Sequence, residues 1–264
     1  MGGGALMDLG LQDKVAWVLG ASSGLGKASA QILANEGAHV AMSARDEAKL
    51  EAAADKVGGS AFPLDVKDGE AIISTASAIE ERFGGFDILV ANAGGPPPGT
   101  FDSFDDDALY DAFTLTTASA WRATKAVLPS MRARGGGAIV YITSITTKEV
   151  VDGLLLSNMM RAAVVGMMKT LARELGPDNI RVVCAAPGHH DTPRVQQLDE
   201  ARSKAEGKPV DEIRARMASS IPLGRLGDPL EFGNAVAFLA SPAASYISGV
   251  SLTIDGGQLR SISM

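Results

Sequence analysis

Short apolar runs alternate with longer amphipathic segments along most of this chain. An apolar run between turn residues is typical of a buried strand, and an apolar stripe with a period of 3.6 is typical of a helix. The runs predict strands at Val15–Leu19, His39–Ser43, Ser60–Leu64, Ile88–Ala91, Ala138–Thr143, Val182–Ala185 and Ser251–Ile254. The stripes predict helices at Gly26–Glu36, Glu47–Lys56, Gly69–Arg82, Asp107–Arg134, Leu155–Leu175 and Leu230–Leu239.

This alternation predicts an α/β fold with a doubly wound parallel sheet and helices on both faces. We expect residues 11–264 to form one domain and residues 1–10 to be a loose tail. The segment Thr192–Ser220 interrupts the alternation of strands and helices, because it is charged and helix-prone. It is interpreted as a solvated helical excursion or as a lid over a substrate, and the two are compatible.

A glycine-rich turn, Gly20-Ala21-Ser22-Ser23-Gly24-Leu25-Gly26, follows the first predicted strand. Its glycines allow the backbone to approach a ligand closely, and the next helix offers free N–H groups to an anion. Small residues also tighten ordinary strand–helix turns. Here a strand precedes the turn, and a helix and a second strand follow within one βαβ unit, which favours a nucleotide phosphate site.

Composition narrows the function further. The 264 residues are 46% hydrophobic, so a large core forms without disulfides, and the single Cys184 excludes an intrachain one. Cys184 is expected to be a small buried side chain. A net charge of −7 without a Lys/Arg run disfavours nucleic acid and anionic membranes as partners. No apolar stretch would span a bilayer, and the start lacks a signal-peptide pattern, so we expect a cytoplasmic protein.

Four further motifs stand in a specific order after the glycine turn. They are Leu64-Asp65-Val66, Ala91-Asn92-Ala93-Gly94, Pro187-Gly188 with Thr192 four residues on, and Asp255-Gly256-Gly257. With these motifs the chain resembles the short-chain dehydrogenases/reductases over nearly its whole length. The resemblance implies a single Rossmann domain with a seven-stranded parallel sheet, a nicotinamide dinucleotide, and a homodimer or homotetramer.

The resemblance also implies a cofactor contact for each motif. Asp65 would bind the adenine amino group and the Val66 N–H would meet the ring, although Asp65 alone would suit a helix N-cap. The Asn92–Gly94 turn would leave room for ribose and nicotinamide; taken alone, it is a tight turn. Pro187–Gly188 would line the carboxamide and Thr192 would bind it. Without the resemblance, these three residues indicate only a loop.

The end of the second predicted strand bears on the choice of cofactor. Family members that prefer NAD carry an acidic residue there, where this chain has Ala44. Arg45 would pair with a 2′-phosphate, and Ser22 and Ser23 would add hydroxyl donors. Arg45 could instead be a solvated charge or stack on adenine. The missing acid favours NADP, with NAD as the alternative.

The family's chemistry uses Tyr-x-x-x-Lys on one helix face, a serine upstream and an asparagine on an earlier helix. Ser144 fits the serine, but Ser157 and Arg161 stand where the resemblance places tyrosine and lysine, and the asparagine position falls at or next to Thr116. A serine hydroxyl is a weaker acid than a phenol. Arg161 keeps a charge for the ribose hydroxyls but does not relay protons. We therefore expect an altered active site.

Two histidines are candidates for the missing proton donor. His189 and His190 follow the Pro187–Gly188 motif and titrate near neutrality. We prefer His190; the alternative is that both are loop residues without a role. Tyr141 should point away from Ser144 and pack in the core, and Tyr110 is expected in the core or an interface. No metal site is expected, because no Cys/His cluster accompanies the histidines.

These inferences predict an NADP-dependent oxidoreductase that transfers hydride between nicotinamide and a small or medium hydrophobic carbonyl or alcohol substrate. A 3-oxoacyl reductase is the family default. Ser144, with Ser157 and a water, would bind the substrate oxygen. Two alternatives remain: an inactive dinucleotide-binding subunit or sensor, and a non-redox enzyme on the same scaffold.

Overall fold

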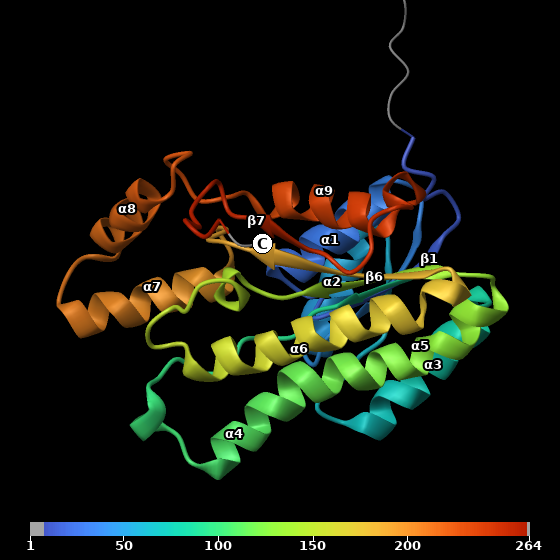
Figure 1. The fold of residues 1–264 in the computed structure, drawn as a ribbon, viewed down its shortest axis with the longest axis horizontal. Helices are drawn as coiled ribbons and strands as arrows, with labels where there is room; N and C mark the ends of the chain where they lie inside the picture. Colours follow the sequence, from blue (N-terminus) through green and yellow to red (C-terminus); the bar gives the residue numbers. More distant parts are fainter. Residues whose placement is uncertain (1–7, 263–264) are drawn as a thin grey trace, which may run out of the picture.

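The computed structural model describes residues 8–262 of the chain (Figure 1). Seven strands form one parallel sheet in the order β3-β2-β1-β4-β5-β6-β7. They are β1 Val15–Leu19, β2 His39–Ser43, β3 Ser60–Ala61, β4 Ile88–Ala91, β5 Gly137–Ile142, β6 Ile180–Pro187 and β7 Ser251–Ile254. The predicted α/β class and all seven strands are confirmed.

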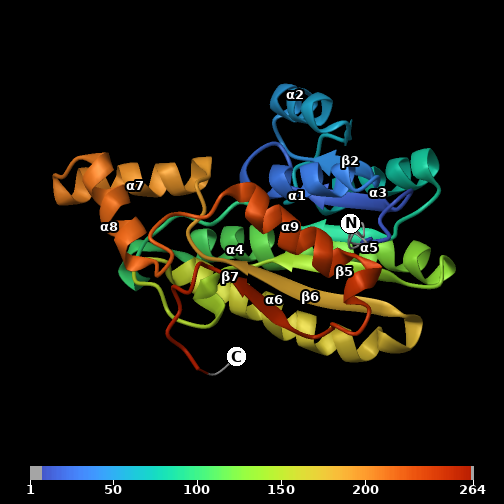
Figure 2. The same cartoon turned by 90° about the horizontal axis from the view of Figure 1, so that it is seen from above.

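Both faces of the sheet are covered by helices, as Figure 2 shows from above. One face carries α1 Gly24–Asn35, α2 Glu47–Val57 and α9 Pro229–Ala240. The other carries α3 Gly69–Phe83, α5 Ser119–Ala133 and α6 Leu155–Glu174. Side chains of β1 alternate between the two cores, with Val18 in one and Trp17 in the other. A strand buried on both faces explains why its sequence is continuously apolar.

Strand order reverses beside β1. The chain runs from β1 outward through β2 to β3, and then returns to place β4 on the other side of β1. Helices after β1 and β4 therefore leave on opposite faces, which opens a crevice at the carboxyl ends of these two strands. The glycine-rich turn follows β1 and the Asn92–Gly94 motif follows β4, so both lie at this switch point.

The prediction of one continuous helix at Asp107–Arg134 is wrong in one respect. It forms as α4 Asp106–Phe113 and α5, joined by a wider π-helical turn at Thr114–Ala118. The Ser119 hydroxyl donates to the carbonyls of Leu115 and Thr116, and such side-chain bonding competes with regular helical bonding. The hydroxyl of Thr116 is buried without a hydrogen-bond partner among the described residues.

The segment after β6 forms two helices, α7 Pro193–Glu206 and α8 Val210–Ser220, which project beyond the sheet (Figures 1 and 2). Arg214 of α8 pairs with Asp191 of the loop before α7 at 2.9 Å and lies 3.8 Å from Asp199 of α7. Short 3₁₀ turns lie at Phe101–Ser103, Ile145–Thr147, Gly176–Asp178 and Pro242–Ala244. No helix in the range 8–262 is long and apolar enough to cross a membrane.

The structure also tests several predictions for single residues. Residues 1–7 of the predicted tail lie outside the described residues, and Leu9 packs against the core. Tyr141 and Cys184 are buried as expected, and the Tyr141 hydroxyl lies 2.7 Å from Thr124 Oγ1. Tyr110 is 66% exposed, which excludes the core and leaves an interface, the other position predicted for it.

Candidate functional site

The glycine-rich turn packs directly onto the end of β4. Asn92 Nδ2 donates to the Gly20 carbonyl at 3.3 Å. Gly20 and Gly24 adopt left-handed backbone conformations, with φ of 60° and 54°. A Cβ on Gly26 would overlap the Gly20 carbonyl and lie 2.8 Å from Asn92 Nδ2. Glycine is therefore required at position 26 for close packing, independently of any ligand.

The start of α1 is left open toward the crevice. Ser23 is the N-cap residue, yet its side chain makes no capping hydrogen bond, and the first turn holds no acidic residue. By contrast, aspartate side chains cap α2, α3, α4 and α9, at Asp46, Asp68, Asp105 and Asp228. The first N–H groups of α1 and its positive dipole end thus remain available to an anion.

Two adjoining cavities meet at this turn. The larger cavity, about 870 Å³, lies over β1, β2 and α4. The smaller cavity, about 290 Å³, lies over β5, β6 and the start of α7. Both are lined by Gly20, Ser23, Asn92, Ala93, Gly94, Gly95 and Pro96. They form one crevice that runs across the switch point, with the glycine turn near its middle.

The larger cavity collects the residues predicted to recognise the adenosine end of a dinucleotide. Ser22, Ser23, Arg45 and Val66 line it. Lys49 of α2 and Lys67 line it too and were not predicted from the sequence; Lys67 is paired with Asp111 at 2.9 Å. Asp65 is exposed and accepts from the Lys67 N–H at 3.0 Å. The N-cap role considered for Asp65 is wrong, because Asp68 caps α3.

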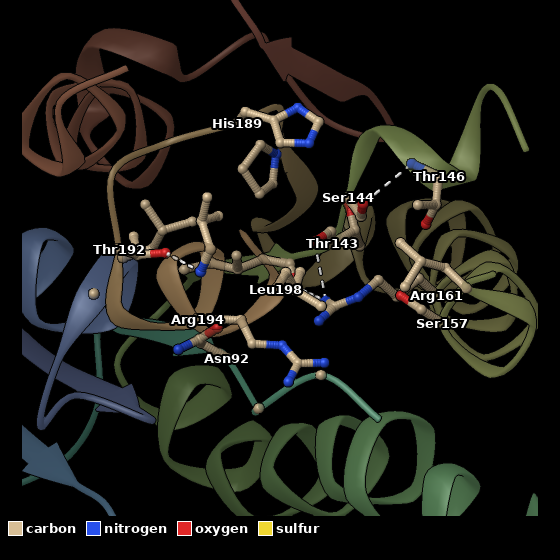
Figure 3. Close-up of a pocket in the computed structure, with 18 of the residues that line it drawn as sticks. Asn92, Thr143, Ser144, Thr146, Ser157, Arg161, His189, Thr192, Arg194 and Leu198 are labelled. Atoms are coloured by element: carbon tan, nitrogen blue, oxygen red, sulfur yellow. Dashed lines mark hydrogen bonds between the residues drawn. The ribbon is translucent and has the colours of Figure 1, made fainter. Parts of the chain in front are cut away.

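The smaller cavity brings together the residues predicted for the reacting end (Figure 3). Its lining includes Ser144 after β5, Ser157 and Arg161 on α6, and Pro187, Gly188 and Thr192 after β6. Thr192 caps α7 through Val195 N–H at 3.3 Å, and a Cβ on Gly24 would lie 3.5 Å from its side chain. Gly188 packs so closely that an added Cβ would lie 2.6 Å from Asp255 Cβ.

The serine and the arginine at the end of β5 have defined partners. Ser144 Oγ accepts from the Thr146 N–H at 3.1 Å, so its own proton is free to be donated. Arg161 Nη1 donates to the carbonyls of Ile142 and Thr143, both at 3.0 Å. Burial, and secondarily the charge of Arg194, lowers the pKa of Arg161 to about 10, so it stays charged at neutral pH.

The two histidines point to different surroundings. His189 lines the smaller cavity, and its Nδ1 lies 2.9 Å from Gln258 Oε1. His190 is 3% exposed, packs edge-on against Phe232 and lines none of the cavities described. The chain bends at His189, beyond the end of β6, and the two neighbouring rings face different surroundings. The geometry does not support the predicted preference for His190; His189 has the better access.

Burial also sets the protonation of these histidines. It lowers the pKa of both rings below the ordinary value of 6.5, and this effect exceeds that of the opposing hydrogen bonds that the rings donate to Gln258 Oε1 and to the Gly188 carbonyl. Both are therefore neutral near pH 7. Among the described residues, no group of three or more His, Cys, Asp or Glu side chains is placed to hold a metal ion.

The lining also contains residues that the sequence analysis missed. Arg194, Leu198 and Arg202 of α7 line the smaller cavity, as does Thr146, whose buried hydroxyl has no partner within residues 8–262. The three α7 residues recur at intervals of four, which is a readable signal for one helix face. The sequence does not say which partner that face meets.

Comparison with known proteins agrees with this geometry over nearly the whole chain. A family model described as enoyl-(acyl carrier protein) reductase matches residues 20–258. The 3-oxoacyl-[acyl-carrier-protein] reductase FabG of Vibrio cholerae is 36% identical over 251 residues, which cover 94% of this chain and 98% of that protein. The oxidoreductase UcpA of Salmonella typhimurium is 37% identical over 254 residues, 94% of this chain and 95% of UcpA.

A solved structure shares the same architecture. L-sorbose reductase from Gluconobacter frateurii, complexed with NADPH and L-sorbose, superposes with a TM-score of 0.91 and 34% identity. The match covers 97% of this chain and all of that one. Actinorhodin polyketide ketoreductase with NADPH has a TM-score of 0.90 at 31% identity, over 94% of this chain and 98% of the other.

Proposed function

Because this chain belongs to the short-chain dehydrogenase/reductase family, we propose that it is an NADPH-dependent reductase of a carbonyl substrate, or the corresponding alcohol dehydrogenase. One observation carries the proposal. The residues that line the crevice run without a break from Arg45, past the glycine turn, to Ser144 and Arg161. That order matches a dinucleotide laid across the switch point with its nicotinamide at the smaller cavity.

Residues of this chain fit the parts of NADP in turn. The open N-terminus of α1 would hold the pyrophosphate. Arg45 and Lys49 would pair with the 2′-phosphate, and Ala44 places no carboxylate at the end of β2; Asp46 and Asp111 also line the cavity, where Asp46 caps α2 and Asp111 pairs with Lys67. Following the family pattern, Asp65 and Val66 would meet adenine, and Asn92, Ala93 and Gly94 would border the ribose. Pro187, Gly188 and Thr192 would contact the carboxamide.

When bound, NADPH supplies a hydride to the carbonyl carbon, and the carbonyl oxygen takes up one proton. The proton on Ser144 Oγ is free for a hydrogen bond to that oxygen, because the Thr146 N–H occupies the acceptor side. Ser157 lies one turn before Arg161 on the same face of α6 and also lines the cavity. The Arg161 charge would stabilise negative charge on the oxygen and hold the ribose hydroxyls.

His189 is the candidate acid–base group for that proton, directly or through a water. With the Gln258 amide oriented as described, Nδ1 carries the hydrogen and Nε2 is an acceptor. A neutral imidazole at pH 7 suits proton removal from an alcohol, and its protonated form suits reduction. Replacing His189 by Gln should lower kcat by about 10²-fold and leave the NADPH affinity unchanged, since general acid–base catalysis contributes at least that much.

The function is tested by titrating the purified protein with NADPH and NADH, followed by a turnover screen over ketones and alcohols. We expect NADPH to bind at micromolar concentration and at least about 10-fold more tightly than NADH, in line with one lost phosphate pair. Turnover of a carbonyl compound with NADPH would complete the assignment. Failure of both nucleotides to bind at about 1 mM would contradict it.

A second function is favoured by one observation, the Ser157 and Arg161 pair where the family pattern has tyrosine and lysine. A binding protein without turnover would keep the crevice and lose the proton relay. Tight NADPH binding without turnover of any substrate, together with activity gained in a Ser157→Tyr/Arg161→Lys variant, would support this alternative. Activity of the natural chain would exclude it.

We also expect a homodimer or homotetramer, as the family pattern implies. The outer surface of α4 and α5 exposes aromatic side chains that suit an interface: Tyr110 at 66% and Trp121 at 56%. Sedimentation of the protein and of a Tyr110→Glu/Trp121→Glu variant would test this. The variant should dissociate if these helices form the interface.

A further inference from the structure

The smaller cavity is lined by cations without a counter-charge. Arg161 comes from α6, and Arg194 and Arg202 come from α7. In the part of the chain that the structure describes, no aspartate or glutamate lines this cavity. The chain as a whole carries 31 acidic residues against 24 basic ones, so a lack of carboxylates does not explain the arrangement.

Other arginines near this segment are paired. Arg214 and Arg216 of α8 bind Asp191 and Glu206, at 2.9 and 2.6 Å, and Arg225 binds Glu231. The three cavity arginines form no ion pair with any residue in the range 8–262. On α7 itself, Glu206 pairs with Arg216 at 2.6 Å. Asp199 is fully buried, lies 3.8 Å from Arg214, and has no hydrogen-bond partner for either carboxylate oxygen in the range 8–262, but it does not line the cavity.

The unpaired arginines also face one another. Arg194 Nη2 donates to the Pro96 carbonyl at 2.8 Å, which holds its guanidinium over the cavity, and Figure 3 shows it pointing toward the same space as Arg161. Burial lowers the pKa of both groups, and the charge of Arg194 adds to the effect at Arg161. Two half-buried like charges destabilise each other until an anion lies between them.

The two arginines of α7 lie at different distances from the glycine turn. Thr192, at the start of α7, contacts the glycine turn where a pyrophosphate would sit. Arg202 is ten residues farther on, which is about 15 Å along the helix axis. This distance exceeds the reach of an arginine side chain, so Arg202 serves the end of the cavity away from the turn. Between the two arginines of α7, Leu198 offers an apolar surface, and Val151 and Leu154 also line the cavity.

We propose that the substrate is a small carbonyl or alcohol compound with an anionic group, a carboxylate or a phosphate, that binds Arg202 in the field of Arg161 and Arg194. Its apolar part packs on Leu198, and its reacting carbon lies toward Ser144. This inference rests on the proposed function, because the same cavity holds the reacting end of the cofactor. The substrate predicted from the sequence is hydrophobic, whereas the substrate proposed here has an apolar part and a charged group.

The test compares substrates that differ only in charge. Oxo acids of three to seven carbons are assayed against their methyl esters, and dihydroxyacetone phosphate against dihydroxyacetone, at saturating NADPH. We expect at least one anion to exceed its neutral partner in kcat/KM by about 30-fold or more, as for a charge-assisted pair. In an Arg202→Leu variant this preference should fall below about 3-fold, whereas Arg216→Leu, a matched loss of charge on α8, should retain it. The carboxylate and phosphate series show which anion is preferred.

Two controls distinguish a failure of this inference from a failure of the proposed function on which it rests. The NADPH Kd of Arg202→Leu should stay within about 2-fold of the natural chain; an equal loss of nucleotide affinity would assign Arg202 to the cofactor and overturn the proposal. If no substrate turns over, calorimetric titration of the NADP⁺-saturated protein with the same anions gives the answer. Binding that Arg202→Leu weakens about 10-fold supports the proposal, and no binding up to about 10 mM, or a preference for the neutral compounds, refutes it. Failure to bind NADPH would instead contradict the proposed function.

Discussion

Replacing Gly26 by alanine tests whether the glycine turn and β4 form one packed unit. The added Cβ would overlap the Gly20 carbonyl and approach Asn92 Nδ2 to 2.8 Å. Such overpacking costs about 1–3 kcal/mol, because neither backbone nor a bonded amide moves freely. Alanine in a helix otherwise gains up to about 1 kcal/mol over glycine. The net loss of folding free energy is therefore about 0–3 kcal/mol.

Gly166 supplies a matched control. It lies in α6, it is exposed, and a Cβ there meets nothing within 4 Å. Gly166→Ala should therefore stabilise the protein by up to about 1 kcal/mol. The two variants should differ by about 1–3 kcal/mol, which for a chain of this size is a gap in Tm of roughly 2–12 °C.

The same clash should weaken cofactor binding. Either the Gly20 carbonyl or the Asn92 amide must move, and both residues line both cavities. We expect the NADPH Kd of Gly26→Ala to rise at least about 10-fold and that of Gly166→Ala to change less than about 2-fold. Thermal melting and fluorescence titration give the two readouts. Equal melting temperatures of the two variants with unchanged NADPH affinity would refute the packing argument.

Three further predictions concern the ends of the crevice and its pH response. Arg45→Ala should weaken NADPH by about 10–100-fold and NADH by less than 3-fold, because one charge-assisted pair contributes about 1.5–3 kcal/mol; equal losses in titrations of both nucleotides would place Arg45 elsewhere. Ser144→Ala should lower kcat by about 10²–10³-fold in steady-state assays at unchanged NADPH affinity, as for other donors to a developing oxyanion, and a retained kcat would remove Ser144 from the mechanism. Since the folded state lowers the pKa of His189 and His190, the unfolded chain binds more protons below about pH 6.5, so Tm should fall between pH 7 and pH 5. His189→Gln should reduce that slope, and an identical slope would show that His189 does not contribute.

The fold was predictable because its signals are local. Four strands, among them β1 and β4, have the predicted bounds, since apolar runs between turn residues mark both ends. β3 ends at Ala61, three residues before its predicted end, although the N–H groups of Phe62 and Leu64 still donate to the Met42 and Ala44 carbonyls at 2.8 and 3.0 Å. The π-helical turn at Thr114–Ala118 was missed, because it depends on hydrogen bonds that helical periodicity does not report.

The site was predictable only where a motif fixes the backbone. Gly20, Asn92 and Pro187 lie along the crevice because they stand at or directly after the carboxyl ends of β1, β4 and β6. Side-chain direction in irregular backbone was not predictable, and so His190 was preferred over His189. The contribution of Arg194 and Arg202 depends on how α7 docks, which is a tertiary property that no local spacing contains.

A crystal structure of the protein with NADP⁺ would show directly whether the crevice holds a dinucleotide. The proposed binding mode places the 2′-phosphate within hydrogen-bond distance of the Arg45 guanidinium, the pyrophosphate at the start of α1, and the nicotinamide ring in the smaller cavity beside Ser144 and Arg161. A nucleotide bound away from the switch point, or in the reverse direction with adenine beside Ser144, would contradict it.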